Sequence, residues 1–303
     1  MNPNLLTYST EVKAALANKK PIVALESTVT AHGLPRPQNL ETALRLEQIV
    51  RDVGAVPATI AILNGQLHVG LNAGQISFIA GSDDIKKVST RDLPLSVAQK
   101  WNGATTVAST SWVAHRAGIK VFATGGIGGV HRGTLTDISG DLPILATTPI
   151  VVVCSGAKIV LDLPATREWL ETHGVPVIGY KCDSMPAFYS RTSELPIDGR
   201  ADSPAEVVQI FLAQQALDIE RALLVTVPVP EQFEVPASEL DASLKSALHE
   251  AARNGVVGRD VTPFLLSRMV QSSGGATLIA NLALLENNAR VASQIAVALA
   301  SAS

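Results

Sequence analysis

The residues with the widest chemical range in this chain lie between residues 121 and 161, in a loop between two runs rich in Val and Ile. The first run ends at Ala123 and the second covers residues 149–154, and both have the composition of buried strands. Glycine lets a backbone approach a ligand closely and turn its N–H groups toward an anion. The loop contains five such residues, which are Gly125, Gly126, Gly128, Gly129 and Gly133.

Charged and hydroxyl side chains follow these glycines. His131 and Arg132 supply imidazole and guanidinium donors, and Asp137, Ser139 and Asp141 come at alternate positions. In an extended segment, alternate positions place their side chains on one side of the chain. A polar turn also explains an Asp-x-Ser-x-Asp pattern, so this motif alone does not identify a site.

Lys158 follows the second apolar run, after the turn formed by Ser155, Gly156 and Ala157. We expect it where a strand ends and a helix begins, which is the usual location of an active site in an α/β protein. A lone lysine at such a position is also common as a solvated strand end, and GGIGG is not the GxGxxG dinucleotide motif. The convergence of all these groups within forty residues is what predicts a site.

Two further groups stand outside this loop. Glu26 closes the apolar run PIVAL, where a carboxylate is either solvated or held for acid–base chemistry. Lys86, Lys87 and Arg91 form a basic cluster, which by position alone is typical of a solvated patch.

Length and composition favour one α/β domain over residues 1–303, with a layered α-β-α architecture and a mostly parallel central sheet. Of the 303 residues, 47% are hydrophobic and 17% charged, as expected for heavily buried parallel strands. Asn64-Gly65 between two apolar runs predicts a type I′ hairpin turn. Residues 103–118 and 237–299 are predicted to be helical, and no linker or repeat divides the chain.

Net charge, cysteine content and the lack of a targeting pattern indicate what kind of protein this is. A net charge of −3 gives no support for binding to nucleic acid or to a membrane surface. Cys154 and Cys182 follow apolar runs and fit reduced core thiols better than a disulfide. Without a signal-peptide pattern or a long uninterrupted apolar run, we expect a cytoplasmic protein.

Many separate segments of the chain, in order, resemble the pseudouridine-5′-phosphate glycosidases, also described as indigoidine-synthase-A-like proteins. The resemblance spans about Leu5 to Leu299. Its anchors are ALESTVTAHGLPRPQN, KVSTRDLP, GATTVAST, FATGGIGGVHRG, DISGDL, VVCSGAK, PAFYSR and TPFLLSRMVQSSGGATLIANLALLENNA. It implies reversible cleavage of the C–C glycosidic bond of pseudouridine 5′-phosphate to uracil and ribose 5-phosphate, with a divalent cation such as Mn²⁺ or Mg²⁺. It also implies a homotrimer.

The resemblance assigns roles to residues. Lys158 matches a Schiff-base lysine, Glu26 a proton donor, and Asp137 a metal-linked carboxylate. The matched substrate contacts are Lys87, Val107, Ser139, Gly140 and Asp141. We expect Lys87, His131 and Arg132, with the N–H groups of the glycine loop, to clamp the phosphate, and Asn281 to pair with the uracil edge.

The chemistry agrees with these roles. A C-glycoside has no heteroatom leaving group to protonate, so two carboxylates are not sufficient. An amine that opens the ribose and forms an iminium at C1 makes the C–C bond breakable.

Two alternatives stay open at the level of sequence. One is an aldolase-like Schiff-base lyase that acts on another sugar phosphate, and the other is a non-catalytic nucleotide-binding protein. The chain also departs from the family pattern at Cys182, Ser184 and Met185, where Thr, Glu and Phe are more frequent, and the role of that loop is not assigned.

Overall fold

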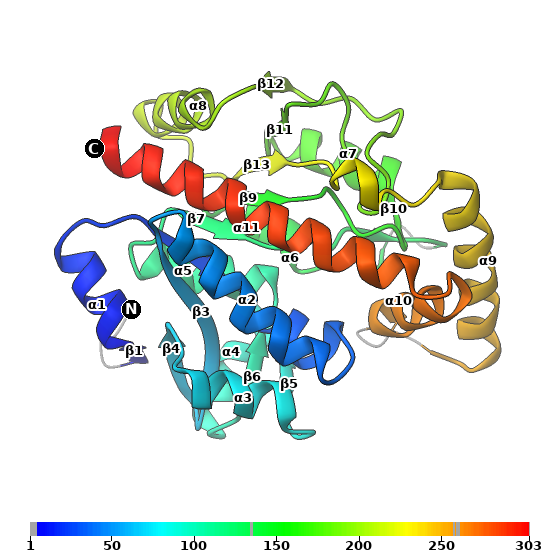
Figure 1. Ribbon diagram of the computed structural model, residues 1–303, viewed down its shortest axis with the longest axis horizontal. Helices are drawn as coiled ribbons and strands as arrows, with labels where there is room; N and C mark the ends of the chain where they lie inside the picture. Colours follow the sequence, from blue (N-terminus) through cyan, green and yellow to red (C-terminus); the bar gives the residue numbers. More distant parts are fainter. Residues whose placement is uncertain (1–4, 134–135, 257, 259–260, 303) are drawn as a thin grey trace.

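The computed structural model describes residues 5–133, 136–256, 258 and 261–302. One large sheet runs through the molecule in the order β1-β4-β3-β2-β7-β9-β13-β11-β12, with β6 paired to β3 and β5 paired to β6 (Figure 1). Its strands are β1 (Leu6–Tyr8), β2 (Ile22–Leu25), β3 (Val56–Leu63), β4 (Gln66–Val69), β5 (Lys86–Val88), β6 (Gly103–Thr105), β7 (Val121–Ala123), β9 (Val151–Cys154), β11 (Val177–Tyr180), β12 (Gly199–Ala201) and β13 (Leu223–Thr226). A separate pair joins β8 (Val130–His131) to β10 (Leu161–Asp162).

Helices flank this sheet. The α-helices are α1 (Thr10–Ala17), α2 (Gln38–Asp52), α3 (Ala73–Gly81), α4 (Leu93–Ala98), α5 (Val107–Arg116), α6 (Asp141–Leu145), α7 (Leu163–Thr172), α8 (Pro204–Ala216), α9 (Ala237–Arg253), α10 (Val261–Ser272) and α11 (Ala276–Ala302). The long α11 crosses in front of β7 and β9 and lies beside α2 (Figure 1). A short π-helix, η2 (Val29–Gly33), follows β2.

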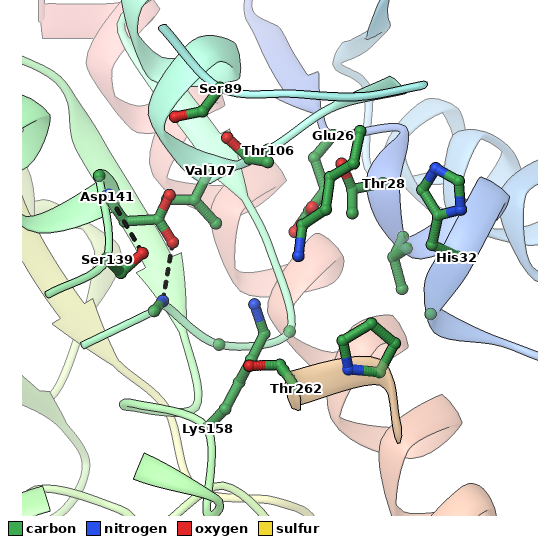
Figure 2. Close-up of a pocket in the computed structure, with 18 of the residues that line it drawn as sticks. Glu26, Thr28, His32, Ser89, Thr106, Val107, Ser139, Asp141, Lys158 and Thr262 are labelled. Atoms are coloured by element: carbon green, nitrogen blue, oxygen red, sulfur yellow. Dashed lines mark hydrogen bonds between the residues drawn. The ribbon is translucent and has the colours of Figure 1, made fainter. Parts of the chain in front are cut away.

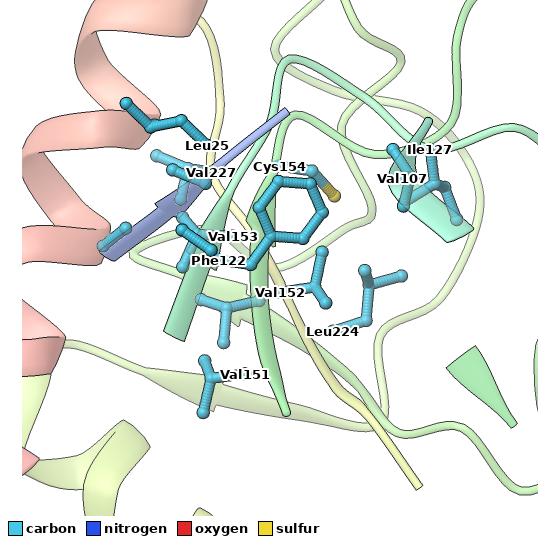
Figure 3. Packing of buried hydrophobic residues seen from close by; sticks show 14 of the residues in the cluster. Leu25, Val107, Phe122, Ile127, Val151, Val152, Val153, Cys154, Leu224 and Val227 are labelled. Atoms are coloured by element: carbon cyan, nitrogen blue, oxygen red, sulfur yellow. The ribbon is translucent and has the colours of Figure 1, made fainter. Parts of the chain in front are cut away.

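The central strands confirm the predicted α/β architecture with a mostly parallel sheet. β2, β7, β9 and β13 pair in parallel, and every residue in them is buried. A strand that is buried at both odd and even positions needs cover on both faces, so α-helices must pack on each side. Phe122 lies at the centre of this core, among Val152, Val153 and Leu224 (Figure 3).

Local sequence signals predicted several elements correctly. β3 and β4 form an antiparallel hairpin in which Leu63 pairs with Gln66 across Asn64-Gly65, and both turn residues have positive φ, as a type I′ turn requires. The C-terminal part is helical in α9, α10 and α11, as expected. No helix in the described ranges is long and apolar enough to cross a membrane.

Two predictions are corrected. The first residues of the segment 103–118 form strand β6 and not a helix, because Gly103 and Ala104 pair with Ile62 and Ala61 of β3. Lys158 does not stand at the start of a helix, since the short strand β10 separates it from α7. Long-range pairing decides both cases, and a local pattern does not contain that information.

The order of the strands determines where the site lies. β2, β7 and β9 are parallel neighbours, with Leu25 opposite Ala123 and Ala123 opposite Val153. Their carboxyl ends therefore meet at one edge of the sheet, where parallel α/β proteins bind ligands. The residues that follow these strands, Glu26 and Thr124 among them, are brought together at this edge.

Candidate active site

A cavity of about 350 Å³ opens at the carboxyl ends of these strands, which is large enough for a small ligand. It collects residues from many separate parts of the chain, from Glu26 after β2 to Asn281 in α11. Figure 2 shows several of them. The predicted site residues that line it are Glu26, Lys87, Val107, His131, Asp137, Ser139, Gly140, Asp141, Lys158 and Asn281. The structure thus brings ten of the eleven predicted residues to one place.

Glu26 is buried, with 8% of its surface exposed, and Thr124 Oγ1 donates a hydrogen bond to its Oε1. Burial raises the pKa of this carboxyl, because the charged form loses its hydration. The positive charge of Lys158 and the Thr124 hydroxyl oppose that rise, Asp141 adds to it, and Lys87 opposes it more weakly. A carboxyl with a raised pKa holds its proton closer to neutral pH and is suited to act as a general acid.

Lys158 extends into the middle of the cavity from the turn after β9 (Figure 2). Its backbone N–H donates to Ile127 O at 3.1 Å. Gly156 in this turn has a φ of +82°, and a Cβ atom there would lie 2.1 Å from Pro186 O. Only glycine fits such a backbone and such a close contact.

The loop whose role the sequence left unassigned packs against this same turn. Phe188 N–H donates to Ser155 O at 3.0 Å, and its ring lies against Gly126 and lines the cavity. The loop therefore supports the backbone that carries Lys158. Of the three unusual positions, Met185 is buried and its methyl group lies near Gly156.

Asp141 forms part of the wall by binding backbone N–H groups. Its Oδ1 accepts from Ala108 N at 2.9 Å, in the first turn of α5, and its Oδ2 accepts from Gly128 N at 2.8 Å. Asp141 also begins α6, so it does not continue an extended alternation with Asp137 and Ser139. This carboxylate fixes the glycine loop to the N-terminus of α5, and Thr106 and Val107 at that N-terminus face the cavity.

The glycines of this loop have a packing role within the protein, and Gly125, Gly126 and Gly128 also line the cavity. A Cβ atom at Gly126, Gly128 or Gly129 would lie 2.7, 2.2 or 2.3 Å from neighbouring side-chain atoms. These glycines are thus required for close packing within the protein, and the N–H group of Gly128 is already bound to Asp141. Of the five glycines in the loop, Gly133 has positive φ.

His131 and Asp137 face each other at the rim, with Nδ1 and Oδ2 3.8 Å apart. Arg132 is separated from them: it is absent from the described lining of the cavity, and its Nη2 donates to Ile159 O at 3.4 Å. Neighbouring residues in an extended segment point in opposite directions, and the sequence could not tell which one faced inward. The structure does not support Arg132 as part of a phosphate clamp.

The Asp137 side chain is 47% exposed and offers a hard oxygen donor. Within the described ranges, no group of three His, Cys, Asp or Glu side chains is placed to hold a metal ion. One carboxylate beside a substrate pocket still suits an ion such as Mg²⁺, which keeps several waters and also binds phosphate oxygens.

Sequence reasoning missed several lining residues. These are Thr28 and His32 from the segment after β2, Ser89 after β5, Thr106 before α5 and Thr262 from α10 (Figure 2). Thr28 and His32 stood in a motif that was noted, but nothing in their spacing showed their direction. Thr262 is more than a hundred residues from Lys158, and only the packing of α10 brings it to the cavity.

Comparison with known proteins agrees with this geometry. Residues 11–298 match the family model described as "Indigoidine synthase A like protein". A pseudouridine-5′-phosphate glycosidase of Geobacillus kaustophilus is 52% identical over 97% of this chain and 98% of its own, and one of Escherichia coli K12 is 50% identical over 98% and 96%.

Solved structures extend the similarity to three dimensions. The prealnumycin C-glycosynthase AlnA, crystallised in complex with ribulose 5-phosphate, superimposes with a TM-score of 0.91 at 40% identity, covering 98% of both chains. An indigoidine synthase A-like protein from Thermotoga maritima gives a TM-score of 0.90 at 38% identity, over 98% of this chain and 97% of its own.

The raised pKa of Glu26 predicts a pH-dependent effect on stability. Because the folded-state pKa exceeds the unfolded one, the contribution of Glu26 is present at low pH and is lost as pH rises through the folded pKa. The Gln side chain of Glu26→Gln cannot ionise. The free energy of unfolding of this variant, minus that of the unmodified protein, should therefore be larger at pH 8 than at pH 4. Urea denaturation at both pH values measures this, with Glu41→Gln on the exposed face of α2 as the control. An equal difference at the two pH values would contradict it.

Proposed function

The chain belongs to the indigoidine synthase A-like family, and from that premise we propose that it is a pseudouridine-5′-phosphate glycosidase. It reversibly cleaves the C–C bond between uracil and ribose 5-phosphate. One observation carries this proposal beyond the family: the buried carboxyl of Glu26 and the amine of Lys158 line one cavity, and the positive charge of Lys158 opposes the rise in the pKa of Glu26. We further propose that it works in the cytoplasm as a homotrimer.

The two groups divide the reaction between them. The Lys158 amine attacks C1 of the ribose and replaces the ring oxygen, and Glu26 donates its proton to that oxygen as the ring opens. The attacking nitrogen, now an ammonium, gives one proton back to the Glu26 carboxylate. Its lone pair then forms an iminium at C1 while the electron pair of the C–C bond leaves with uracil, and C5 of uracil takes up that proton. Water hydrolyses the iminium, releases ribose 5-phosphate and restores the free amine.

We place the phosphate toward the N-terminus of α5. Thr106 and Val107 line the cavity there, next to Ser139 and Gly140, and the positive end of a helix dipole favours an anion. Lys87 adds a positive charge to this part of the cavity, and like Lys158 it opposes the rise in the pKa of Glu26. His131 lies at the rim and belongs to this proposed contact set, whereas Arg132 does not.

Substrate positioning also involves Asn281 and Asp137. Asn281 lines the cavity from α11, and its amide can pair with both an N–H and a carbonyl of a pyrimidine. Asp137 is the proposed ligand of Mn²⁺ or Mg²⁺, which when bound would supply positive charge close to the phosphate. Water and substrate oxygens would complete its shell.

An aldolase-like lyase on another sugar phosphate is the second candidate, since the related AlnA is crystallised with ribulose 5-phosphate and a five-carbon sugar phosphate is common to both reactions. It would use the same amine but would release no uracil. Incubation with Mn²⁺ and pseudouridine 5′-phosphate separates the two, because free uracil is detected by chromatography and ultraviolet absorbance. Turnover without uracil would favour the second candidate, and binding without any turnover would indicate a non-catalytic protein.

Borohydride should trap a covalent adduct on Lys158 in the presence of ribose 5-phosphate, because an iminium is reduced to a stable amine. Peptide mass spectrometry locates the adduct. Lys158→Ala should lose activity by several orders of magnitude while circular dichroism shows an intact fold. An adduct on Lys87, or no adduct, would contradict the assignment of the nucleophile.

Pseudouridine without its phosphate should be a very poor substrate. A charge-assisted hydrogen bond contributes about 1.5–3 kcal/mol, so Lys87→Ala should lower kcat/KM for the phosphorylated substrate by about ten- to a hundredfold. It should leave the weak activity on pseudouridine nearly unchanged. Arg132→Ala is the matched control, because it removes the positive charge next to His131 in the chain, and that side chain does not line the cavity. If Arg132→Ala lowered kcat/KM for the phosphorylated substrate as much as Lys87→Ala, the proposed position of the phosphate would be wrong.

Asp137→Ala should weaken both metal binding and metal-dependent activity. The described residues around it include no cluster that could replace its oxygen. Electron paramagnetic resonance of Mn²⁺ reports binding independently of turnover. Asp162→Ala, which removes the cap of α7, serves as the control. Unchanged Mn²⁺ affinity in Asp137→Ala would remove this residue from the metal site.

A further inference from the structure

Asn288 is a polar residue in the middle of the apolar core, on α11. Its surface is fully buried, so its amide must find partners inside the protein. Nδ2 lies 2.9 Å from Thr124 O, 3.1 Å from Ser155 Oγ and 3.4 Å from Gly125 O, and shares its two hydrogens among these three acceptors. Oδ1 accepts from Ser155 Oγ at 3.4 Å. One side chain therefore binds two separate segments of the chain.

Those two segments carry the proposed catalytic groups. Thr124 follows β7, and its hydroxyl donates to Glu26. Ser155 follows β9 and begins the turn that ends at Lys158. The segments also bind each other, since Ser155 N donates to Gly125 O at 2.8 Å. The amide of Asn288 reinforces this junction from the helix that covers it.

The helix itself does not require this amide. Ser293, five residues further along α11, is equally buried, and its hydroxyl donates within the helix to Ala289 O at 2.7 Å. The hydrogen bonds of Asn288 instead leave the helix and reach backbone atoms at the edge of the active site. An apolar residue of similar volume would pack at this position, but it would leave the Thr124 carbonyl without this donor.

We propose that Asn288 is a positioning residue for the reaction: by holding Thr124 and Ser155 together, its amide fixes Glu26 relative to Lys158. This rests on the proposed function, in which Glu26 protonates the ring oxygen that Lys158 displaces. Both events occur at adjacent atoms of one sugar, so the two side chains must keep a defined separation. The substrate contacts at the N-terminus of α5 lie on other elements and do not depend on Asn288.

The proposal predicts that loss of the Asn288 amide lowers kcat and leaves KM nearly unchanged. Asn288→Ala should lower kcat for uracil release by about ten- to a hundredfold, as small displacements of reacting groups do. KM for pseudouridine 5′-phosphate should stay within about threefold, because the phosphate contacts are retained. The rate of borohydride trapping with ribose 5-phosphate should fall along with kcat. Ser293→Ala removes an equally buried hydroxyl from the same helix and is the matched control.

Two further variants keep the test decisive if Asn288→Ala does not fold. Asn288→Asp preserves the shape of the side chain but replaces the Nδ2 donor with a carboxylate oxygen. Its kcat should fall at least as much as that of Asn288→Ala. Ser155→Ala removes one partner without changing α11 and should cause a smaller loss. Combined with Asn288→Ala, it should give less than the sum of the two effects, because both remove one interaction.

The proposal is overturned if kcat in Asn288→Ala is unchanged. It is also overturned if Ser293→Ala lowers kcat as much as Asn288→Ala does, with a similar loss of melting temperature. Failure of the proposed function would look different. In that case the unmodified protein would itself release no uracil and form no adduct on Lys158.

Discussion

Three parallel strands that end at the same edge of the sheet are the constraint on which the site depends. β2, β7 and β9 are hydrogen-bonded neighbours in register, so Leu25, Ala123 and Val153 lie side by side. The next residues along each strand leave the core together. Glu26, Thr124 and the turn to Lys158 thus share one space without any long side chain reaching across the protein. Every other feature of the cavity is arranged around this edge.

This arrangement places charge where burial is costly. Glu26 is buried at the end of β2, beside β7 and β9, and these three strands are entirely apolar; burial raises its pKa. The charge of Lys158 and the Thr124 hydroxyl stabilise the ionised carboxyl in part, but the pKa of Glu26 stays raised. In a structural role, such a carboxyl would be a liability. In a reaction that requires a proton donor beside an amine, the same environment is an advantage.

The walls of the cavity are held by polar groups that bind backbone atoms. Asp141 joins the glycine loop to α5, and Asn288 joins the ends of β7 and β9 to α11. The loop that contains Phe188 presses on the turn before Lys158. These contacts explain why glycines are needed here: neighbouring side chains at Gly126, Gly128 and Gly129, and the Pro186 carbonyl at Gly156, leave no room for a Cβ atom. Contacts of this kind fix the backbone around the cavity, and the proposed catalysis by positioning needs such support.

The sequence by itself determined the elements whose signals are local. Apolar runs predicted β7 and β9, and Asn64-Gly65 predicted the β3–β4 hairpin, because strand periodicity and turn chemistry depend on adjacent residues. The several motifs of the family resemblance predicted that Glu26, Lys87 and Lys158 belong to one site.

The tertiary structure alone decided which way side chains point and what the glycines contact. It turned His131 toward the cavity and Arg132 away from it, and it paired β6 with β3. It also made Asn288, which in the sequence only interrupts an apolar helix, the link between Thr124 after β7 and Ser155 after β9. Such decisions depend on contacts between residues far apart in the chain, and no local pattern records them.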